Sequence, residues 1–511
     1  MEFWKSIFQS QSKSPNNQKQ SSGNTNANSK TVLVTSDLAS NLAYIQQALF
    51  QTDDLQTRTF TKKGTTAQLI YLEGICDPNI IKTDIINRLL KADQIDTPED
   101  IVTTLKFKYE TNIEQLISHL LRGFALFFIE GSSQGYAFAA VAALARTPEE
   151  PPNEKVIYGA HTGFIEDLNT NLQLIRKTIH NRDLTVRYYQ VGSTTDTKIA
   201  VMYMGNTACP KIVKEIENRI QSIQMKDIIP GNIIHEIIED NPYSPFPQIL
   251  TTERADRSCA NLIEGRVIIF VEGTACAFVL PVSFFSFYQS TDDYAIRWIP
   301  ATFIRLLRFF SFLIAILLPA FYIAVTSFHS EIIPEGLFTV VKANLLRIPF
   351  APIVEALFLE FTIELVREAG IRLPGPISST IGIVGGLVIG ESVVNAGFVS
   401  SVMIVVVAMT ALATYVVPNH EMSISIRVIR FPIMFMASLF GFIGIVAIVL
   451  ILLIHLCKLE PLGRPYLFPL SPMRIKNFLD TFIRAPIQAV QQLPNDVQEK
   501  PPSTNTKEDQ S

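Results

Sequence analysis

The sequence predicts a protein in two parts: an α/β N-terminal half made of two repeated α/β subdomains, followed by an α-helical transmembrane domain. Two observations predict this division. Apolar side chains gather in the second half of the 511 residues, in uncharged runs long enough to cross a bilayer. Before residue 290, the chain instead shows an internal repeat of strand and helix patterns.

The composition excludes several classes of protein. The chain is 48% hydrophobic and 18% charged, which is too apolar for an ordinary soluble protein and too charged for a pure membrane bundle. A net charge of −4 gives no basis for binding nucleic acid. The five cysteines lack paired spacing, so neither a disulfide framework nor a metal site is expected. Because phosphate loops, nucleophile elbows and HExxH motifs are missing, we expect a non-enzyme without a cofactor.

The chain begins with an arm, residues 1–30, that is mostly Ser, Asn, Gln and Lys. Such a segment cannot bury enough apolar surface to offset its ordering entropy, so we expect it to be disordered. It also lacks the apolar core of a signal peptide. We therefore expect the N-terminal half to stay in the cytoplasm.

An internal repeat organises the N-terminal half. Each copy reads as a strand, a Gly-containing turn, a strand and a helix, followed by a hairpin with a Gly-rich turn. The first copy comprises Arg58–Leu90 and Leu120–Ala139, and the second comprises Arg187–Ile220 and Leu262–Pro281. We predict one α/β subdomain over residues 31–150 and a second over 151–290.

Charged residues around the end of this half are expected to be exposed. Glu253 and Arg254 are expected on a solvated helix face, where ion pairs contribute little to stability. Three arginines suit a cytoplasmic lipid-headgroup boundary just before the first span: Arg297, Arg305 and Arg308.

The transmembrane domain is predicted over residues 291–460, with about four to six membrane elements, and a cytoplasmic, partly disordered tail over 461–511. Uncharged runs cover Phe309–Ser330, Phe398–Val417 and Phe431–Cys457. Basic residues stand on both sides of the last run, so both its flanks look cytoplasmic. Either this run is a hairpin, or its first flank breaks the positive-inside rule.

The segment Pro349–Arg367 is apolar but carries three carboxylates. Glu360 and Glu364 share one helix face, whereas Glu355 lies about 140° away from Glu360 around the helix. Two interpretations are open. The carboxylates face water or a partner inside the membrane, or the helix lies at the interface with its acids solvated.

The segment Leu373–Asn395 has no charged side chain as far as Gly390. Small residues recur at every fourth position and suit close helix packing: Ser378, Gly382, Gly386 and Gly390. A neighbouring face carries Thr380, Val384, Leu387 and Glu391. This helix is either a packed member of a bundle or the lining of a pore or substrate path.

A combination of short motifs points to one family. They are Pro245-Phe246-Pro247-Gln248, Thr252-Glu253-Arg254, Glu264-Gly265-Arg266, Asp293-Tyr294 with Arg297-Trp298, and the run from Glu364 to Gly370 continued by Ile381–Gly390. With these motifs, the chain from about Val32 to Pro472 resembles the A subunits of nutrient germinant receptors, the GerA-type spore germination protein family. One departure is Glu391, where related sequences carry glutamine; it adds a charge and leaves the local ion preference open.

The resemblance implies a receptor complex in the inner membrane of a bacterial endospore. The A subunit would form a homo-oligomeric ring, a pentamer, around a ligand-gated cation pore. A transporter-like B subunit would bind the nutrient, and a C subunit lipoprotein would complete the complex. Opening of the pore would release monovalent cations and start germination.

In this hypothesis, the face that contains Thr380 and Glu391 lines the pore, and Val384 and Leu387 form a hydrophobic gate. Acidic rings of Glu360 and Glu364 would favour cations. Two other functions stay open: a secondary transporter, which inverted repeats among the spans would support, and a passive membrane-anchored signalling scaffold. We find no repeat among the spans, and passive anchors rarely carry so many carboxylates.

Overall fold

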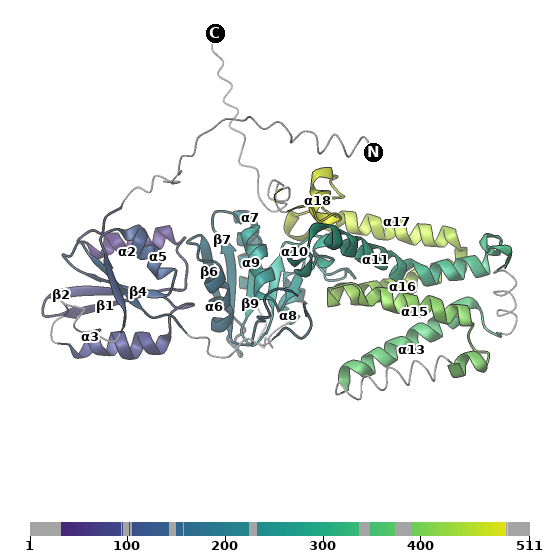
Figure 1. Ribbon diagram of the computed structural model, residues 1–511, viewed down its shortest axis with the longest axis horizontal. Helices are drawn as coiled ribbons and strands as arrows, with labels where there is room; N and C mark the ends of the chain where they lie inside the picture. Colours follow the sequence, from purple (N-terminus) through teal and green to yellow (C-terminus); the bar gives the residue numbers. More distant parts are fainter. Residues whose placement is uncertain are drawn as a thin grey trace, which may run out of the picture.

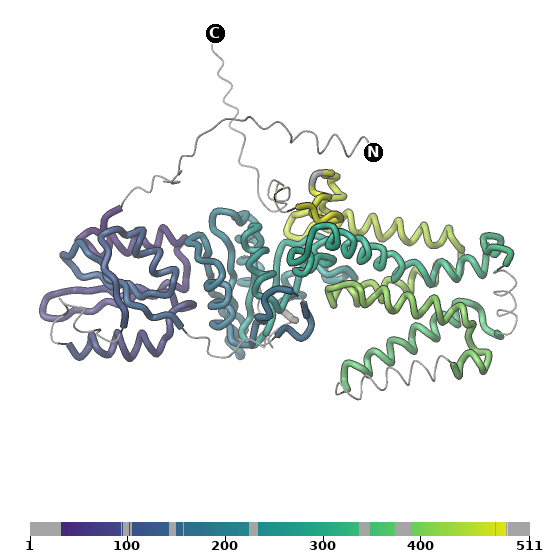
Figure 2. Tube along the Cα trace, viewed as in Figure 1, coloured from purple at the N-terminus to yellow at the C-terminus, as the bar shows by residue number. Residues whose placement is uncertain are grey.

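The computed structural model describes residues 32–92, 95, 102, 105–142, 150–156, 158–223, 232–336, 348–373, 391–486 and 488. Three predicted segments lie wholly or partly outside these residues: the N-terminal arm, the Gly-rich segment from 374 to 390, and the C-terminal tail after residue 488. Within the described part, two sheet-containing units lie side by side, and a set of long helices extends from the second unit (Figure 1). The tube in Figure 2 shows the same order along the chain, from purple to yellow.

The first unit is a five-stranded antiparallel sheet with helices on both faces. Its strands are β1 (Leu55–Lys62), β2 (Thr65–Leu72), β3 (Phe107–Glu110), β4 (Phe124–Ile129) and β5 (Gly135–Ala139), in the order β1-β2-β4-β5-β3. Helices α2 (Leu38–Ala48) and α5 (Ile113–Leu120) cover one face, and the π-helix Ile80–Ile86 with α3 (Asn87–Lys91) covers the other. Alternate residues of β2 enter the two cores, since successive strand side chains point to opposite faces.

The second unit has the same order of strands. β6 (Leu184–Val191), β7 (Thr197–Met204), β8 (Leu250–Thr252), β9 (Val267–Val271) and β10 (Ala277–Leu280) pair as β6-β7-β9-β10-β8. Helices α6 (Leu168–Thr178) and α9 (Ala255–Ile263) pack on one face, and α7 (Pro210–Gln221) and α8 (Asn232–Ile238) pack on the other. Arg254, expected on an exposed face, is 2% exposed because it binds the Asp256 carboxylate at 2.6 Å and the Ala160 carbonyl at 3.0 Å.

The helical part follows the second sheet. Its helices are α10 (Asp292–Ala295), α11 (Trp298–Ser327), α13 (Pro352–Arg372), α15 (Ser401–Tyr415), α16 (His420–Phe440), α17 (Phe442–Lys458) and α18 (Phe478–Thr481). Of the described helices, α11 and α16 are long and apolar enough to cross a membrane, and α15 and α17 are shorter apolar helices. Most of the first predicted span, Phe309–Ser330, lies in α11, which begins eleven residues before it and ends three residues before its end.

The last apolar run is divided at Gly441. This residue has φ +60°, and a Cβ atom here would lie 2.8 Å from the His329 ring. The chain runs away from the second unit along α16 and returns to it along α17. Glu421, near the start of α16, and His455, near the end of α17, both contact the second unit. The run therefore follows the hairpin interpretation. The charge pattern indicated that Arg427 and Arg430 flank a membrane helix. In the structure both arginines instead lie inside α16.

The second unit and the helical part share one core. Phe284, just after β10, packs edge-on against Phe312 of α11, with ring centroids 5.6 Å apart, and against Tyr466, at 6.1 Å. Buried residues of β7, β9 and β10 belong to the same apolar cluster as those of α11, α15 and α16. The two parts therefore lack a separating layer of solvated surface at this contact.

A buried ion pair joins the two sheet units. The Arg176 guanidinium of α6 binds the two carboxylate oxygens of Asp54, just before β1, at 2.8 and 2.9 Å, and both side chains are 1% exposed. The adjacent Asp53 N–H donates to the Val186 carbonyl of β6 at 3.0 Å. This bidentate geometry favours a fixed angle between the units.

We predict that Asp54→Ala destabilises the chain by about 3–5 kcal/mol, because it leaves the Arg176 guanidinium buried without its counter-charge. The matched control is Asp53→Ala, whose partner Arg187 is 28% exposed; its cost should stay below about 1 kcal/mol. Calorimetric unfolding of the full chain measures both. Equal, small effects would show that Asp54 does not fix the contact.

Candidate functional site: the joint between the second sheet and the apolar helices

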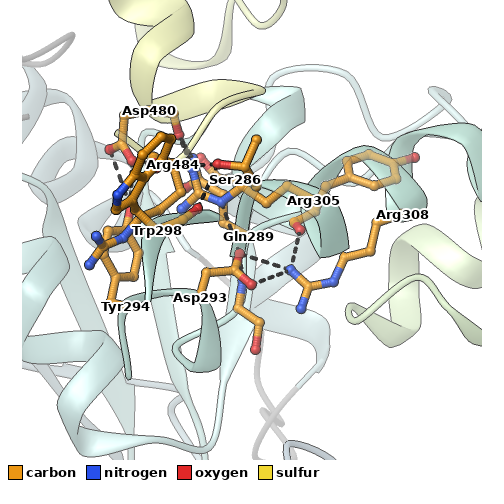
Figure 3. Close-up of polar contacts among 12 residues, drawn as sticks. Ser286, Gln289, Asp293, Tyr294, Trp298, Arg305, Arg308, Asp480 and Arg484 are labelled. Carbon is orange, nitrogen blue, oxygen red and sulfur yellow. Dashed lines mark hydrogen bonds and ion pairs between the residues drawn. The ribbon is translucent and has the colours of Figure 1, made fainter. Parts of the chain in front are cut away.

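A carboxylate removed from solvent marks the start of the helical part. Asp293 of α10 is 0% exposed and binds two arginines of α11. Arg305 Nε donates to Asp293 Oδ2 at 3.0 Å, and Arg308 Nη1 lies 2.8 Å from both carboxylate oxygens. The two arginines are three residues apart and so point from the same helix face. Figure 3 shows both side chains converging on Asp293.

These contacts correct the expectation that the arginines meet lipid headgroups. Arg305 and Arg308 are 4% and 8% exposed. Only Arg297, at the N-cap of α11, stays exposed in the described structure. The physical reason is that a carboxylate and hydrogen bonds at fixed positions offset the desolvation of both guanidinium groups.

A second carboxylate reaches this joint from the C-terminal segment. Arg305 binds the Asp480 carboxylate at 3.2 Å and also its main-chain carbonyl, and Tyr294 donates its hydroxyl to the same carboxylate at 3.0 Å. Asp480 belongs to α18 (Figure 3). Two carboxylates thus face the guanidinium groups of Arg305 and Arg308, and their negative charges offset the cost of burying these two arginines.

Aromatic rings extend the same contact. Phe482, just after α18, packs edge-on against Phe285 at 5.1 Å and against Phe309 of α11 at 5.3 Å. The Arg484 carbonyl accepts a hydrogen bond from Thr302 at 3.3 Å. The C-terminal segment therefore lies along the first three turns of α11 and braces it against the second unit.

A second contact joins α8 and β8 to the first turn of α16. Thr251 donates its hydroxyl to Glu421 at 2.9 Å. The His235 ring lies between two carboxylates, with Nε2 3.5 Å from Glu421 and Nδ1 3.7 Å from Glu239. Burial of the ring by itself lowers the pKa of His235, but the carboxylates outweigh burial and raise that pKa above its ordinary value of 6.5.

A third contact links the proline-rich loop before β8 to α17 and the segment after it. Ser244 Oγ lies 2.9 Å from His455 Nε2 of α17. The Tyr466 hydroxyl, which is buried, donates to the Pro247 carbonyl at 2.6 Å. Together with the packing of Phe284 against Phe312 of α11, the second and third contacts place the second unit against α11, α16 and α17.

The carboxylates predicted for the membrane part are mostly paired inside the chain. Glu360 is 2% exposed and binds Arg430 of α16 at 2.5 Å. Glu364 binds Arg427 at 2.6 Å and Arg367 at 3.1 Å. The interpretation that the acids of this helix are solvated is wrong for Glu360, and for Glu355, which is 1% exposed.

Seven predicted site residues lie outside the described residues. They are Thr380, Val384 and Leu387 of the pore face, and Ser378, Gly382, Gly386 and Gly390 of the packing face. Glu391, the last residue of the predicted pore face, is described and exposed. The residues that sequence reasoning missed are the joint residues Asp293, Asp480, His235 and Glu421. Apart from Glu239, which is four residues from His235, their partners are 12 to 186 positions away, so local periodicity could not reveal these contacts.

The family model and the curated relatives agree on one family. The model of the Bacillus/Clostridium GerA spore germination protein matches residues 43–496. Spore germination proteins B1 and A1 of Bacillus subtilis (strain 168) are each 37% identical to this chain, covering 90% and 88% of it and 97% and 94% of their own lengths. The N-terminal domain of the A subunit of the Bacillus megaterium spore germinant receptor GerK3 is 29% identical, covers 50% of this chain and 98% of that one, and has a TM-score of 0.39.

The fold and the joint define a class of protein in which an α/β part with two sheets is fixed to a set of apolar helices. The chain belongs to the GerA family of spore germination proteins. With two candidate spans and these relatives, it is a membrane protein of spores.

The raised pKa of His235 predicts a pH-dependent joint. Protonated His235 contributes stability that is complete below about pH 6.5, the unfolded value, and is lost as the pH rises through the higher folded value. The unfolding temperature of the full chain should therefore fall over this range, and His235→Gln should remove that part of the fall. His161→Gln, at a half-exposed pair with Glu150, is the control. Identical pH profiles for wild type and His235→Gln would contradict this assignment.

Proposed function

We propose that this chain is the channel-forming A subunit of a nutrient germinant receptor. Its family match over residues 43–496 carries the proposal, since the matched relatives are named for spore germination. In the proposed complex, a transporter-like B subunit binds the nutrient and a C subunit lipoprotein completes the assembly. The A subunits form a pentameric ring in the inner membrane of the spore, with the two sheet units in the cytoplasm.

We also propose that the two sheet units, residues 31–150 and 151–290, are copies of one ancestral subdomain. Their identical strand orders and the sequence repeat support this proposal. The joint then passes a movement of the second copy to α11, α16 and α17, and so to the pore.

The charges inside the helical part support a conducting role over a passive anchor. An anchor needs apolar surface alone, whereas ion pairs such as Glu360–Arg430 are costly to place among apolar helices. Because Glu360 and Glu364 each face an arginine of α16, they would act as acidic rings only after these pairs separate. Opening in this proposal therefore includes a shift of α13 relative to α16.

The pore face is Thr380, Val384, Leu387 and Glu391, with Val384 and Leu387 as a gate that excludes water when closed. Val384→Ala should widen this gate, and spores that carry it should germinate without nutrient at least about tenfold faster than wild type. The control is Ile389→Ala, which removes a comparable aliphatic side chain about 140° from Val384 around the helix. Release of spore solutes without added nutrient measures both.

If Val384→Ala spores germinate only with nutrient and at the wild-type rate, the gate lies elsewhere. Reconstituted protein that never conducts ions would instead favour the scaffold. Uptake of nutrient by this chain alone in liposomes would favour the transporter.

A further inference from the structure

Three oxygen-bearing side chains meet where α11, α13 and α15 lie together, away from the sheets. They are Tyr322 of α11, Glu355 of α13 and Ser400, the N-cap of α15, and they are 8%, 1% and 2% exposed. The Ser400 N–H donates to Glu355 Oε2 at 2.9 Å. The Tyr322 and Ser400 hydroxyl oxygens lie 3.2 Å apart.

Glu355 lacks the arginine partner in the described structure that balances the charge of Glu360 and of Glu364 on the same helix. Glu360 and Glu364 have arginine partners, but no Arg, Lys or His nitrogen of the described residues lies within 4 Å of Glu355. Glu355 Oε1 is buried and receives no hydrogen bond from the described part of the chain. The N-terminus of α15 supplies only about half a positive charge. An ionised carboxylate in this position is therefore undercompensated.

We propose that Glu355, Ser400 and Tyr322 form a buried site for one small monovalent cation, the proton included. Carboxylate and hydroxyl oxygens are hard donors that suit an alkali ion, and the free oxygen Oε1 can equally take up a proton to give the neutral acid. In both cases, the ligand supplies the missing positive charge. Bound cation then ties α13 to α11 and α15. The site does not depend on the proposed pore, because it lies within one subunit.

The test is thermal unfolding of the full chain in lipid nanodiscs, with KCl, NaCl or N-methylglucamine chloride at equal ionic strength. The pH series uses a His235→Gln background, so that the joint does not contribute. A bound ligand should raise the unfolding temperature by on the order of 2 °C or more at saturation. A rise with K⁺ or Na⁺ at constant pH identifies an alkali ion, and a rise only as the pH falls identifies the proton.

Glu355→Gln keeps the size of the side chain and a carbonyl acceptor for the Ser400 N–H but removes the charge, so it should abolish the response. Glu331→Gln, at an exposed carboxylate beyond α11, should leave the response unchanged. Glu355→Asp keeps the charge but moves the oxygens, so the cation or proton concentration at half of the full response should shift at least about threefold. This variant tests the proposal if Glu355→Gln does not fold. No response in the wild type, an equal response in Glu355→Gln, or an unmoved midpoint in Glu355→Asp would overturn the proposal.

Discussion

The arrangement of the helices depends on Asp293, a fully buried carboxylate that binds two guanidinium groups of α11, the first long helix. Neither arginine could be buried there alone, because an unpaired guanidinium among apolar helices is strongly unfavourable. Asp293 therefore fixes both the position of α11 and its rotation about its own axis, since only one face of the helix carries Arg305 and Arg308. Asp480 completes the charge balance from the C-terminal segment.

The same joint explains how the sheet units and the apolar helices can act on each other. A linker between independently stable domains would transmit little, whereas a shared core and fixed ion pairs transmit displacement. The second unit contacts α11 through the Phe284 ring, α16 through the hydroxyl of Thr251, and α17 through the hydroxyl of Ser244. Inside the helical part, α13 is held to α16 by two further ion pairs. A movement of the sheet thus has a continuous set of contacts through which to reach α13.

Much of the fold could be predicted from local patterns, and much of the joint could not. Strand alternation and Gly-containing turns indicated both sheets, and the uncharged run in α11 indicated a long apolar helix. Those signals are local. Arg254 was expected in water and Arg305 at lipid headgroups, because the sequence of an arginine segment does not reveal its partner. In the structure Arg254 is buried against Asp256. Arg305 is buried against Asp293 and Asp480, the second of which is 175 positions away. The sequence could not decide between the hairpin at Gly441 and a single crossing. A charge pattern places the end of a membrane span at its arginines, and this fails here because Arg427 and Arg430 lie inside α16.

The most direct test of the account is a double-mutant cycle between Asp293 and Arg308 in the full chain, read as the free energy of unfolding. Asp293→Ala, Arg308→Ala and the double variant isolate the pairwise contribution. The account predicts that the two substitutions are coupled by about 1–3 kcal/mol, because Asp293→Ala leaves the Arg308 guanidinium buried without its carboxylate, and the double variant no longer contains that guanidinium. Arg305 keeps Asp480 as a partner in all three variants. Effects that add within about 0.5 kcal/mol would show that the joint is not held by this pair.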